Sequence, residues 1–249
     1  MEDSGYCIIG QRGHLSAQIA EKYKEYKRYS VNDIDTINDK SKVIYTSFLK
    51  GNSEDYKLNP GTYLTENFKH IQNALYLSVT KNCDVFFIGS TSGYVKDGEY
   101  NTTNYGYGLS KAIASLISAE AKYVSFYNIV LPSLIGYPIS DKPQLFEQSI
   151  YEAKFKYTTF LKKYKKFLTN SSVVNFLPIE QAVDKINEIC VAEHLTEKNI
   201  FIEPEFAMSV GEFYQSVDHV VAKANKARNA AERYILSYIN REYNEWAKL

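Results

Sequence analysis

The sequence predicts an α/β protein, with a doubly wound parallel sheet of the Rossmann type and a small, mostly helical lobe at the C-terminal end. Three observations lead to this prediction. Short apolar segments alternate with helical segments of crossover length, a glycine-bearing turn follows the first apolar segment, and polar side chains follow several of the others. The sheet is expected over residues 1–137 and the lobe over residues 138–249, both as parts of one compact unit.

The composition argues against several classes of protein. The chain of 249 residues has 29 basic and 29 acidic side chains, and this balance predicts no attraction to nucleic acid or to a membrane surface. Its three cysteines are too far apart for a disulfide framework or a zinc site, so we expect no metal. No apolar run approaches the ~20 residues of a membrane helix, and we see no signal peptide. We therefore expect a cytoplasmic protein.

The first predicted strand and helix enclose a glycine-bearing turn. Residues 5–9 are apolar and predict a buried strand, and residues 17–26 predict a helix with an apolar face. Between them lies Gly10-Gln11-Arg12-Gly13-His14-Leu15-Ser16. Its spacing, Gly-x-x-Gly-x-x-Ser, suits close approach of a pyrophosphate to the backbone and to a helix N-terminus. Taken alone, the segment fits a plain strand-to-helix turn as well as it fits a pyrophosphate-binding turn.

The rest of the predicted sheet follows in order along the chain. Strands are expected at residues 26–31, 42–48, 84–88 and 123–131, helices at 62–80 and 107–121, and a loop at 132–138. Ligands of such sheets bind beyond the carboxyl ends of the strands. The segments expected at those ends are the glycine turn, Thr46-Ser47-Phe48, Ser90-Thr91-Ser92 and residues 132–136. Their convergence is the main argument for a binding site.

The C-terminal part is predicted to be mostly helical. Helices are expected at residues 144–168 (one or two), 179–192 and 217–249, with strands at 172–178 and 199–202. Ser209 and Glu212 form the Ser-x-x-Glu capping pattern that starts a helix. A run of lysines between residues 162 and 166 predicts a solvated helix face, with a phosphate-binding patch as the alternative.

Tyr107 and Lys111 are four residues apart at the start of a predicted helix, so their side chains share one face. An ammonium group beside a phenol lowers the phenol pKa, because the cation stabilises the phenolate. Such a phenol can exchange protons near neutral pH. With 22 tyrosines in the chain the spacing also arises by chance. The pair gains weight from the glycine turn and from the serines after the preceding strand.

These motifs in series resemble the extended short-chain dehydrogenase/reductase superfamily, in its epimerase/dehydratase-like branch. The resemblance covers roughly residues 5–210 and depends on three motifs, which are Gly10-x-x-Gly13-x-x-Ser16, Ile88-Gly89-Ser90 and Tyr107-x-x-x-Lys111. Asn67 is similar to the Asn in the middle helix of that family. The turn, the segment Gly89 to Tyr94 and the segment Pro132 to Pro138 most resemble GDP-L-fucose synthase and related 4-keto nucleotide-sugar reductases.

The resemblance implies NADP or NAD as the cofactor. It assigns cofactor binding to Gly10, Gln11, Arg12, Gly13, His14, Leu15, Thr46, Ser47, Phe48, Asn67, Tyr107, Lys111 and Pro132. Arg12 can pair with a ribose 2′-phosphate, which favours NADP, and a solvated turn residue is the alternative interpretation.

The resemblance also implies a role for each residue near the reacting atoms. Tyr107 would exchange a proton with the substrate oxygen, and Lys111 would lower the Tyr107 pKa and bind the nicotinamide ribose. Ser90 would hydrogen-bond the substrate oxygen. Thr91, Ser92 and Leu134 would complete the substrate site. The alternative for residues 90–92 is a strand-end turn that caps its own backbone.

Two departures from the family narrow the expected activity. Ser92 stands where fucose synthase has a Cys that serves epimerisation, and serine is a far weaker acid or base than a thiol. We therefore expect reduction of a 4-keto group of a deoxy nucleotide-sugar. Leu134 replaces an Asn that usually contacts the substrate in that family, so the sequence does not identify the ligand.

Two other functions stay open on the residues. One is a nucleotide-sugar 4-epimerase with tightly held NAD, and the other is a non-catalytic nucleotide-binding protein on a degenerate fold. The resemblance also implies a homodimer through the helices beside the Tyr107 segment.

Overall fold

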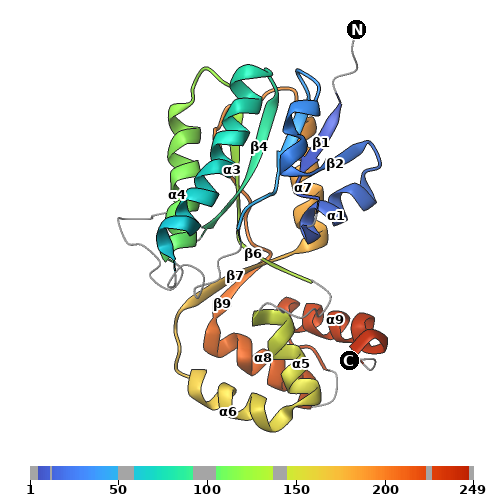
Figure 1. The fold of residues 1–249 in the computed structure, drawn as a ribbon. Helices are drawn as coiled ribbons and strands as arrows, with labels where there is room; N and C mark the ends of the chain where they lie inside the picture. The colour runs from blue at the N-terminus through green and yellow to red at the C-terminus, as the bar shows by residue number, and fades with distance from the viewer. Residues whose placement is uncertain are drawn as a thin grey trace. The chain divides into compact units, whose positions relative to one another are not determined.

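The computed structural model describes residues 5–11, 13–49, 59–91, 105–136, 145–222 and 226–246. The chain divides into two compact units (Figure 1). The first comprises Met1–Pro132 with Glu180–Glu203, and the second comprises Ser133–Ile179 with Pro204–Leu249. The first unit therefore takes in a segment from well beyond residue 137.

The first unit contains a six-stranded parallel sheet with the strand order β2-β1-β3-β4-β5-β8. Its strands are β1 (Tyr6–Ile9), β2 (Tyr26–Tyr29), β3 (Lys42–Tyr45), β4 (Asp84–Ser90), β5 (Phe126–Leu131) and β8 (Asn199–Phe201). The central strands are apolar along most of their length because helices cover both faces of a parallel sheet. The predicted doubly wound sheet is confirmed.

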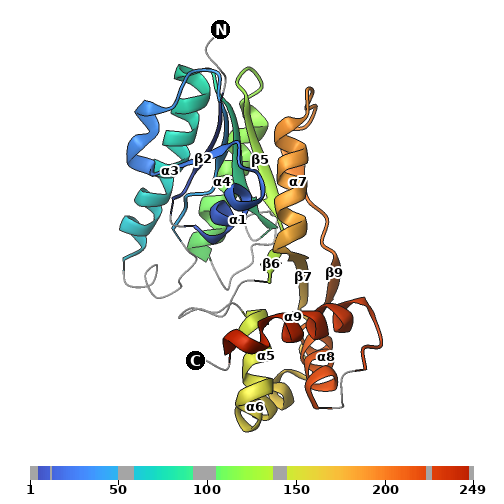
Figure 2. The ribbon, with the colours of Figure 1, turned by 90° about the vertical axis from the view of Figure 1, so that its right-hand side faces the viewer.

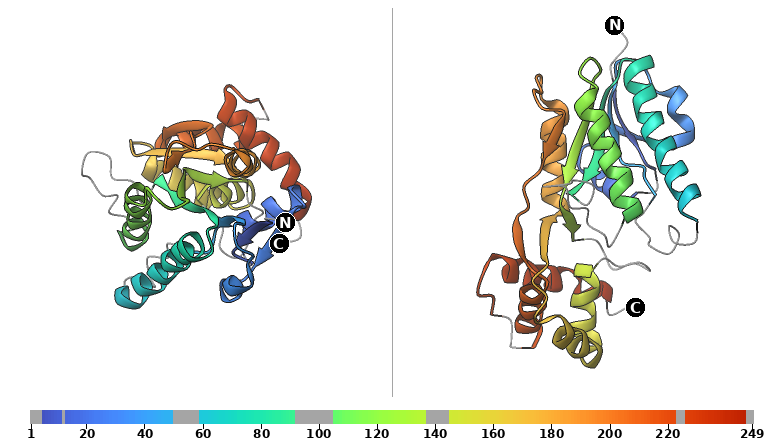
Figure 3. Two further views of the ribbon diagram at one scale, coloured as in Figure 1. Left: turned by 90° about the horizontal axis from the view of Figure 1, so that it is seen from above. Right: turned by 90° about the vertical axis from the view of Figure 1, so that its left-hand side faces the viewer.

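Helices enclose this sheet on two sides. They are α1 (His14–Lys22), the 3₁₀ helix η1 (Val31–Thr36), α3 (Pro60–Thr80), α4 (Tyr105–Glu120) and α7 (Ile179–Val191). The helices α3 and α4 lie side by side on one face, and α1 and α7 lie on the other (Figures 1 and 3). The core on the α3–α4 face includes Val43, Phe87, Ile71 and Ala114, all almost fully buried.

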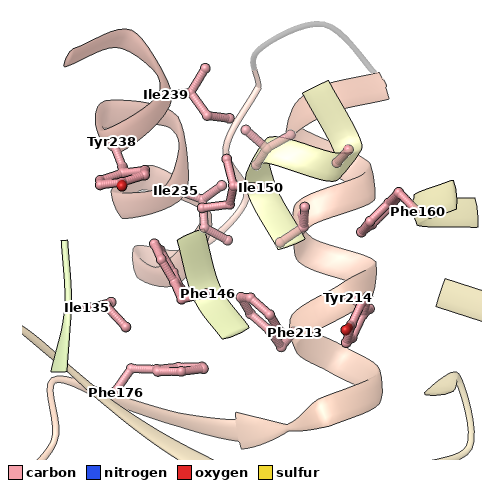
Figure 4. Close-up of a cluster of buried hydrophobic side chains, with 13 residues drawn as sticks. Ile135, Phe146, Ile150, Phe160, Phe176, Phe213, Tyr214, Ile235, Tyr238 and Ile239 are labelled. Atoms are coloured by element: carbon pink, nitrogen blue, oxygen red, sulfur yellow. The ribbon is translucent and has the colours of Figure 1, made fainter. Parts of the chain in front are cut away.

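The second unit combines a three-stranded sheet with four helices (Figure 2). Its elements are β6 (Ser133–Ile135), α5 (Leu145–Phe155), α6 (Tyr157–Phe167), β7 (Val173–Pro178), β9 (Phe206–Ser209), α8 (Val210–Ala222) and α9 (Ala230–Trp246). Phe146 of α5 packs against Phe176 and Phe213 at ring-centroid distances of 5.7 Å, at the centre of an aromatic core (Figure 4). None of the described helices has the length and apolar character needed to cross a bilayer.

Two elements of the first unit end earlier than predicted. The helix expected at residues 17–26 spans His14–Lys22, because Tyr26 joins β2, pairs with Tyr6 and packs on its ring at 5.0 Å. The strand expected at 42–48 ends at Tyr45, so Phe48 lies beyond the sheet. Both differences arise from pairing with other strands, which local apolarity does not encode.

Two predictions for the second unit were wrong. The loop expected at 132–138 contains β6, because Ser133–Ile135 pairs in parallel with Phe176–Pro178. The long helix expected at 217–249 is two helices, since α8 ends at Ala222 and Asn229 Oδ1 accepts the Glu232 amide at 2.9 Å near the start of α9. The Ser209–Glu212 cap is confirmed, with Ser209 Oγ accepting the Glu212 amide at 3.1 Å.

Candidate active site at the carboxyl edge of the sheet

Four strands of the first unit end at one edge of the sheet. The register pairs Ile9 with Tyr45 and Ser90 with Leu131, so the residues that follow β1, β3, β4 and β5 lie along that edge. The Thr46 amide and hydroxyl both donate to the Ile9 carbonyl, at 2.9 and 2.8 Å. The glycine turn, Thr46, Ser90 and Pro132 are thereby brought to the edge where ligands of such sheets bind.

The glycine turn is tight and requires glycine at its first position. Gly10 has a φ of 131°, and a Cβ there would stand 2.1 Å from Thr46 Oγ1. Its amide donates to the Tyr29 carbonyl at 3.0 Å, and the Gly13 amide donates to the Gly10 carbonyl at 3.0 Å. Ser16 is fully buried, with its Oγ 2.5 Å from the Gly10 carbonyl and 2.6 Å from the Gly13 carbonyl. Ser16 therefore braces the turn from inside the protein.

The N-terminus of α1 directly follows this turn. Gly13 is the N-cap, makes no side-chain capping bond, and no acidic residue lies in the first turn. His14 opens the helix, and burial lowers the pKa of its ring. Helix-start amides without a carboxylate in the first turn suit an anionic group. Gln11 lies in the turn, its carbonyl bonded by the Arg28 guanidinium, and Arg12 lies outside the described residues.

Ser90 and Tyr107 are joined by a side-chain hydrogen bond, although one ends β4 and the other lies in the first turns of α4. Burial raises the pKa of Tyr107 to about 12, the hydrogen bond from Ser90 lowers it, and Tyr63 raises it. The predicted lowering of the Tyr107 pKa by Lys111 is wrong for this structure. Desolvation of the phenolate outweighs the other effects, because α4 packs Tyr107 against the core.

Lys111 is almost fully buried, with 4% of its surface exposed. Its Nζ donates to the Ile88 carbonyl at 2.6 Å and lies 3.8 Å from the Phe48 ring centroid. The Phe87 and Tyr107 rings lie at 5.0 and 5.6 Å from the same atom. Burial lowers the pKa of Lys111 to about 7, because an ammonium group is poorly solvated among these rings.

Asn67 of α3 connects three segments of the first unit. It is fully buried, its Oδ1 accepts the Leu49 amide at 3.0 Å, and its Nδ2 lies 3.5 Å from Ser110 Oγ on α4. Ser110 Oγ in turn donates to the Gly106 carbonyl at 2.8 Å. In this arrangement the predicted cofactor residue holds the segment after β3 and the start of α4 in place.

The remaining predicted residues are placed as follows. Ser47 and Phe48 follow β3, Leu15 lies in the first turn of α1, and Thr91 follows β4 with an exposed side chain. Leu134 lies on β6 in the second unit. Ser92 lies outside the described residues. Among the described residues, no group of His, Cys, Asp or Glu could hold a metal ion.

Sequence reasoning missed the residues that support this edge. Phe87 lies behind Lys111, His70 contacts the Phe48 ring at 6.2 Å, and Asn128 lies behind Gly89. Each is far in sequence from the residue it supports. Phe87 could have been found from its position two residues before Gly89 on an apolar strand, whereas His70 and Asn128 give no local signal.

No protein-family model and no curated protein sequence matches the chain. Solved structures do match it. A GDP-mannoheptose C4 reductase from Campylobacter jejuni with NADP bound has 15% sequence identity and a TM-score of 0.71, with 100% of each chain covered. A GDP-6-OMe-4-keto-L-xylo-heptose reductase from C. jejuni has 16% identity and a TM-score of 0.68, with 100% of this chain and 99% of that chain covered.

A third similar structure is that of an enzyme named for a different reaction. L-threonine dehydrogenase from Phytophthora infestans has 15% identity and a TM-score of 0.66, with 99% of this chain and 100% of that chain covered. At these identities the likeness establishes the fold alone, which this chain shares with the two reductases and the threonine dehydrogenase.

Proposed function

We propose that this chain is an NAD(P)-dependent oxidoreductase of the extended short-chain type, which reduces the 4-keto group of a deoxy nucleotide-sugar. The observation that carries the proposal is the hydrogen-bonded pair of Ser90 and Tyr107, with Lys111 one helical turn further along α4. This triad lies at the same sheet edge as the glycine turn. Fold alone supports many chemistries, so the proposal depends on the triad.

The residues of the turn fit a dinucleotide. The turn at Gly10 is tight, the Gly13 N-cap makes no side-chain capping bond, and the first turn of α1 has no acidic residue that would oppose a pyrophosphate. The turn and Thr46 would hold the cofactor, which supplies or accepts the hydride when bound. The similar C. jejuni reductase described with NADP bound supports NADP over NAD.

Each member of the triad has a task within this proposal. Tyr107 gives a proton to the substrate oxygen as the ketone becomes an alcohol, and Ser90 donates a hydrogen bond to that oxygen. Lys111 contributes a positive charge when protonated, which favours the phenolate that Tyr107 leaves behind. Its lowered pKa makes this charge sensitive to whatever group approaches Nζ.

The substrate class is supported by two observations outside the triad. The two similar C. jejuni structures are, by their names, reductases of GDP-linked heptoses. The name of one of them specifies a 4-keto heptose. Ser92 in place of a thiol favours reduction without epimerisation. We assign Thr91 and Ser92 to substrate contact.

The first experiment is titration of the purified chain with NADPH and NADH, followed by turnover on a panel of GDP-linked and other 4-keto nucleotide-sugars. Tyr107→Phe should bind the cofactor normally and lose roughly 10²–10⁴-fold in turnover, the usual contribution of a general acid. Tyr123→Phe is the matched control, because Tyr123 is fully exposed. Failure of the wild-type chain to bind either cofactor would overturn the proposal.

The same panel separates the alternatives. Tightly bound NAD in the purified protein, with product epimerised at C4, would favour the 4-epimerase. Oxidation of L-threonine with NAD⁺ would favour the chemistry of the threonine dehydrogenases that share the fold. If Tyr107→Phe left the activity that the protein supports in cells unchanged, the non-catalytic alternative would be favoured.

We also propose a homodimer through α3 and α4. Tyr76 and Val79 on α3 and Leu116 on α4 are 37%, 56% and 65% exposed, so these two adjacent helices present large side chains that a second copy could cover. Light scattering should give a dimer for the wild-type chain and a monomer for Leu116→Glu. A wild-type monomer at micromolar concentration would contradict the proposal.

A further inference from the structure

Three aromatic rings enclose the ammonium group of Lys111. They belong to Phe48, Phe87 and Tyr107, and the Phe48 ring is the nearest, with its centroid 3.8 Å from Nζ. One donor of the ammonium bonds the Ile88 carbonyl at 2.6 Å. A cation this close to a ring face is held by attraction to the π-electrons, so Phe48 both shields Lys111 and stabilises its charged form.

The Phe48 ring blocks one approach to Nζ. An oxygen atom bonded to Nζ needs about 2.8 Å to the nitrogen and a further van der Waals distance of about 3.5 Å to any ring behind it. The 3.8 Å between Nζ and the ring centroid leaves no room for that atom. A hydroxyl group can therefore bond Nζ from this side only after the ring has moved.

Of the three rings, Phe48 is the one that can move with least disturbance. Phe87 is fully buried within β4, and Tyr107 lies on the same helix as Lys111. Phe48 is half-buried and lies outside any helix or strand, after β3 has ended. Rotation of its side chain needs no break in the sheet or in α4.

The backbone beside Phe48 is nevertheless anchored. The Leu49 amide donates to Asn67 Oδ1 at 3.0 Å, and the Tyr63 hydroxyl donates to the Leu49 carbonyl at 3.4 Å, both on α3. The ring also makes edge contacts with Phe87 at 5.8 Å and Tyr107 at 6.0 Å. The segment is therefore held, and the side-chain torsions of Phe48 are the remaining freedom.

We propose that Phe48 is a positioning residue, whose ring covers Lys111 and controls the access of hydroxyl groups to its ammonium. Under the proposed function, on which this identification rests, those hydroxyls belong to the nicotinamide ribose. Binding the ribose then exchanges the contact with Phe48 for hydrogen bonds to Nζ. Phe48 thereby weakens cofactor binding and keeps Lys111 shielded until the cofactor arrives.

The test measures access to Lys111 without relying on activity. Burial lowers the pKa of Lys111 to about 7, so near neutral pH a large share of its amine is neutral and nucleophilic. Pulsed acetylation of the full chain with acetic anhydride, followed by mass spectrometry, gives the rate at Lys111 relative to exposed Lys122. The variants are Phe48→Ala and Phe48→Leu, and Leu49→Ala is the control from the same segment.

The expected result is slow acetylation of Lys111 in the wild-type chain and in Leu49→Ala. Phe48→Ala should raise the Lys111 rate about tenfold, the change that corresponds to losing a contact of roughly 1.4 kcal/mol. Phe48→Leu keeps an apolar side chain of similar bulk but has no ring face, so it should give an intermediate acetylation rate. This second variant keeps the test valid if Phe48→Ala does not fold. An unchanged rate in a folded Phe48 variant would overturn the proposal.

Cofactor binding supplies the second readout. NADPH should protect Lys111 from acetylation, and its dissociation constant should fall several-fold in Phe48→Ala. Weaker NADPH binding in Phe48→Ala would mean that the Phe48 ring supports the bound cofactor. That result would contradict the proposal that the ring covers Lys111 and opposes cofactor binding. If Lys111 becomes reactive in Phe48→Ala but neither NADPH nor NADH protects it in any variant, the proposed function fails while the cover on Lys111 stands.

Discussion

The Asn128 side chain on β5 lies so close to Gly89 on β4 that a Cβ at Gly89 would stand 2.3 Å from Asn128 Oδ1. Asn128 is fully buried, and its Nδ2 donates to Ser115 Oγ at 2.9 Å and to Asn199 Oδ1 at 2.8 Å. These hydrogen bonds hold the Asn128 side-chain amide in place, so it cannot move away from Gly89. Packing therefore requires a glycine directly before Ser90, and the path of β4 into the site depends on it.

Gly89→Ala should destabilise the protein by roughly 1–3 kcal/mol, the usual cost of forcing an extra methyl group into a packed core. Denaturant unfolding measures this. Gly61→Ala is the control, because nothing lies within 4 Å of a Cβ there and alanine favours the α3 helix. The double variant Gly89→Ala with Asn128→Ala should lose less stability than the two single changes added together. Simple additivity would contradict the proposed clash.

Ser16→Ala should loosen the glycine turn. The hydroxyl lies within hydrogen-bond distance of the Gly10 and Gly13 carbonyls, which share its one proton, and its loss should lower the free energy of unfolding by about 1 kcal/mol. Calorimetry of NADPH binding should show a several-fold weaker affinity than for the wild-type chain. The exposed Ser171→Ala is the control. If Ser16→Ala were less stable but bound NADPH with unchanged affinity, the Ser16 hydroxyl would support the fold of the turn without contributing to cofactor binding.

Lys111→Met should make the protein more stable near neutral pH while removing its activity. The folded chain holds the pKa of Lys111 at about 7, against 10.5 for an ordinary lysine, so the unfolded chain binds more protons between these values. Wild-type stability therefore rises with pH across this window. The advantage of Lys111→Met should be full below about pH 7, shrink above it and vanish beyond about pH 10.5.

Denaturant unfolding at a series of pH values checks this dependence, with exposed Lys122→Met as the control. A stability difference between Lys111→Met and the wild-type chain that does not change with pH would contradict the assignment of the lowered pKa to Lys111.

Ser90→Ala should raise the Tyr107 pKa further, because the hydrogen bond from Ser90 lowers that pKa in the wild-type chain. Carbon-13 NMR of labelled tyrosine, assigned with Tyr107→Phe, measures the titration. Thr91→Ala is the control, since the Thr91 side chain next to Ser90 is exposed. A Tyr107 titration that is the same in Ser90→Ala and in the wild-type chain would show that the two side chains are not coupled.

The sequence by itself predicted the parallel, doubly wound sheet and most of its strands and helices in chain order, and it predicted which segments follow the strands at the carboxyl edge. Apolar runs, turn glycines and the Ser209–Glu212 cap are local patterns, and local patterns are set by neighbours in the chain. The place of Ser90 at a strand end and of Tyr107 and Lys111 on the following helix predicted that they share one edge, and in the structure the Ser90 side chain hydrogen-bonds Tyr107. Their catalytic roles stay predictions.

Only the tertiary structure decided the environment of these residues. The Tyr107 pKa rises although a lysine lies one turn away, because burial of the phenol depends on the packing of α4 and not on spacing. The start of α9, by contrast, has a local signal that sequence reasoning missed, because Asn229 Oδ1 accepts the Glu232 amide and Arg228 pairs with Glu232 four residues further on.

Phe48 covers Lys111, and Asn128 requires Gly89, through contacts between segments far apart in sequence. Such contacts exist only after the strands have paired, because pairing alone brings their ends to one edge. The sequence therefore predicted the candidate reactive groups, and the fold sets the burial of Tyr107 and Lys111 and places the Phe48 ring against the Lys111 ammonium.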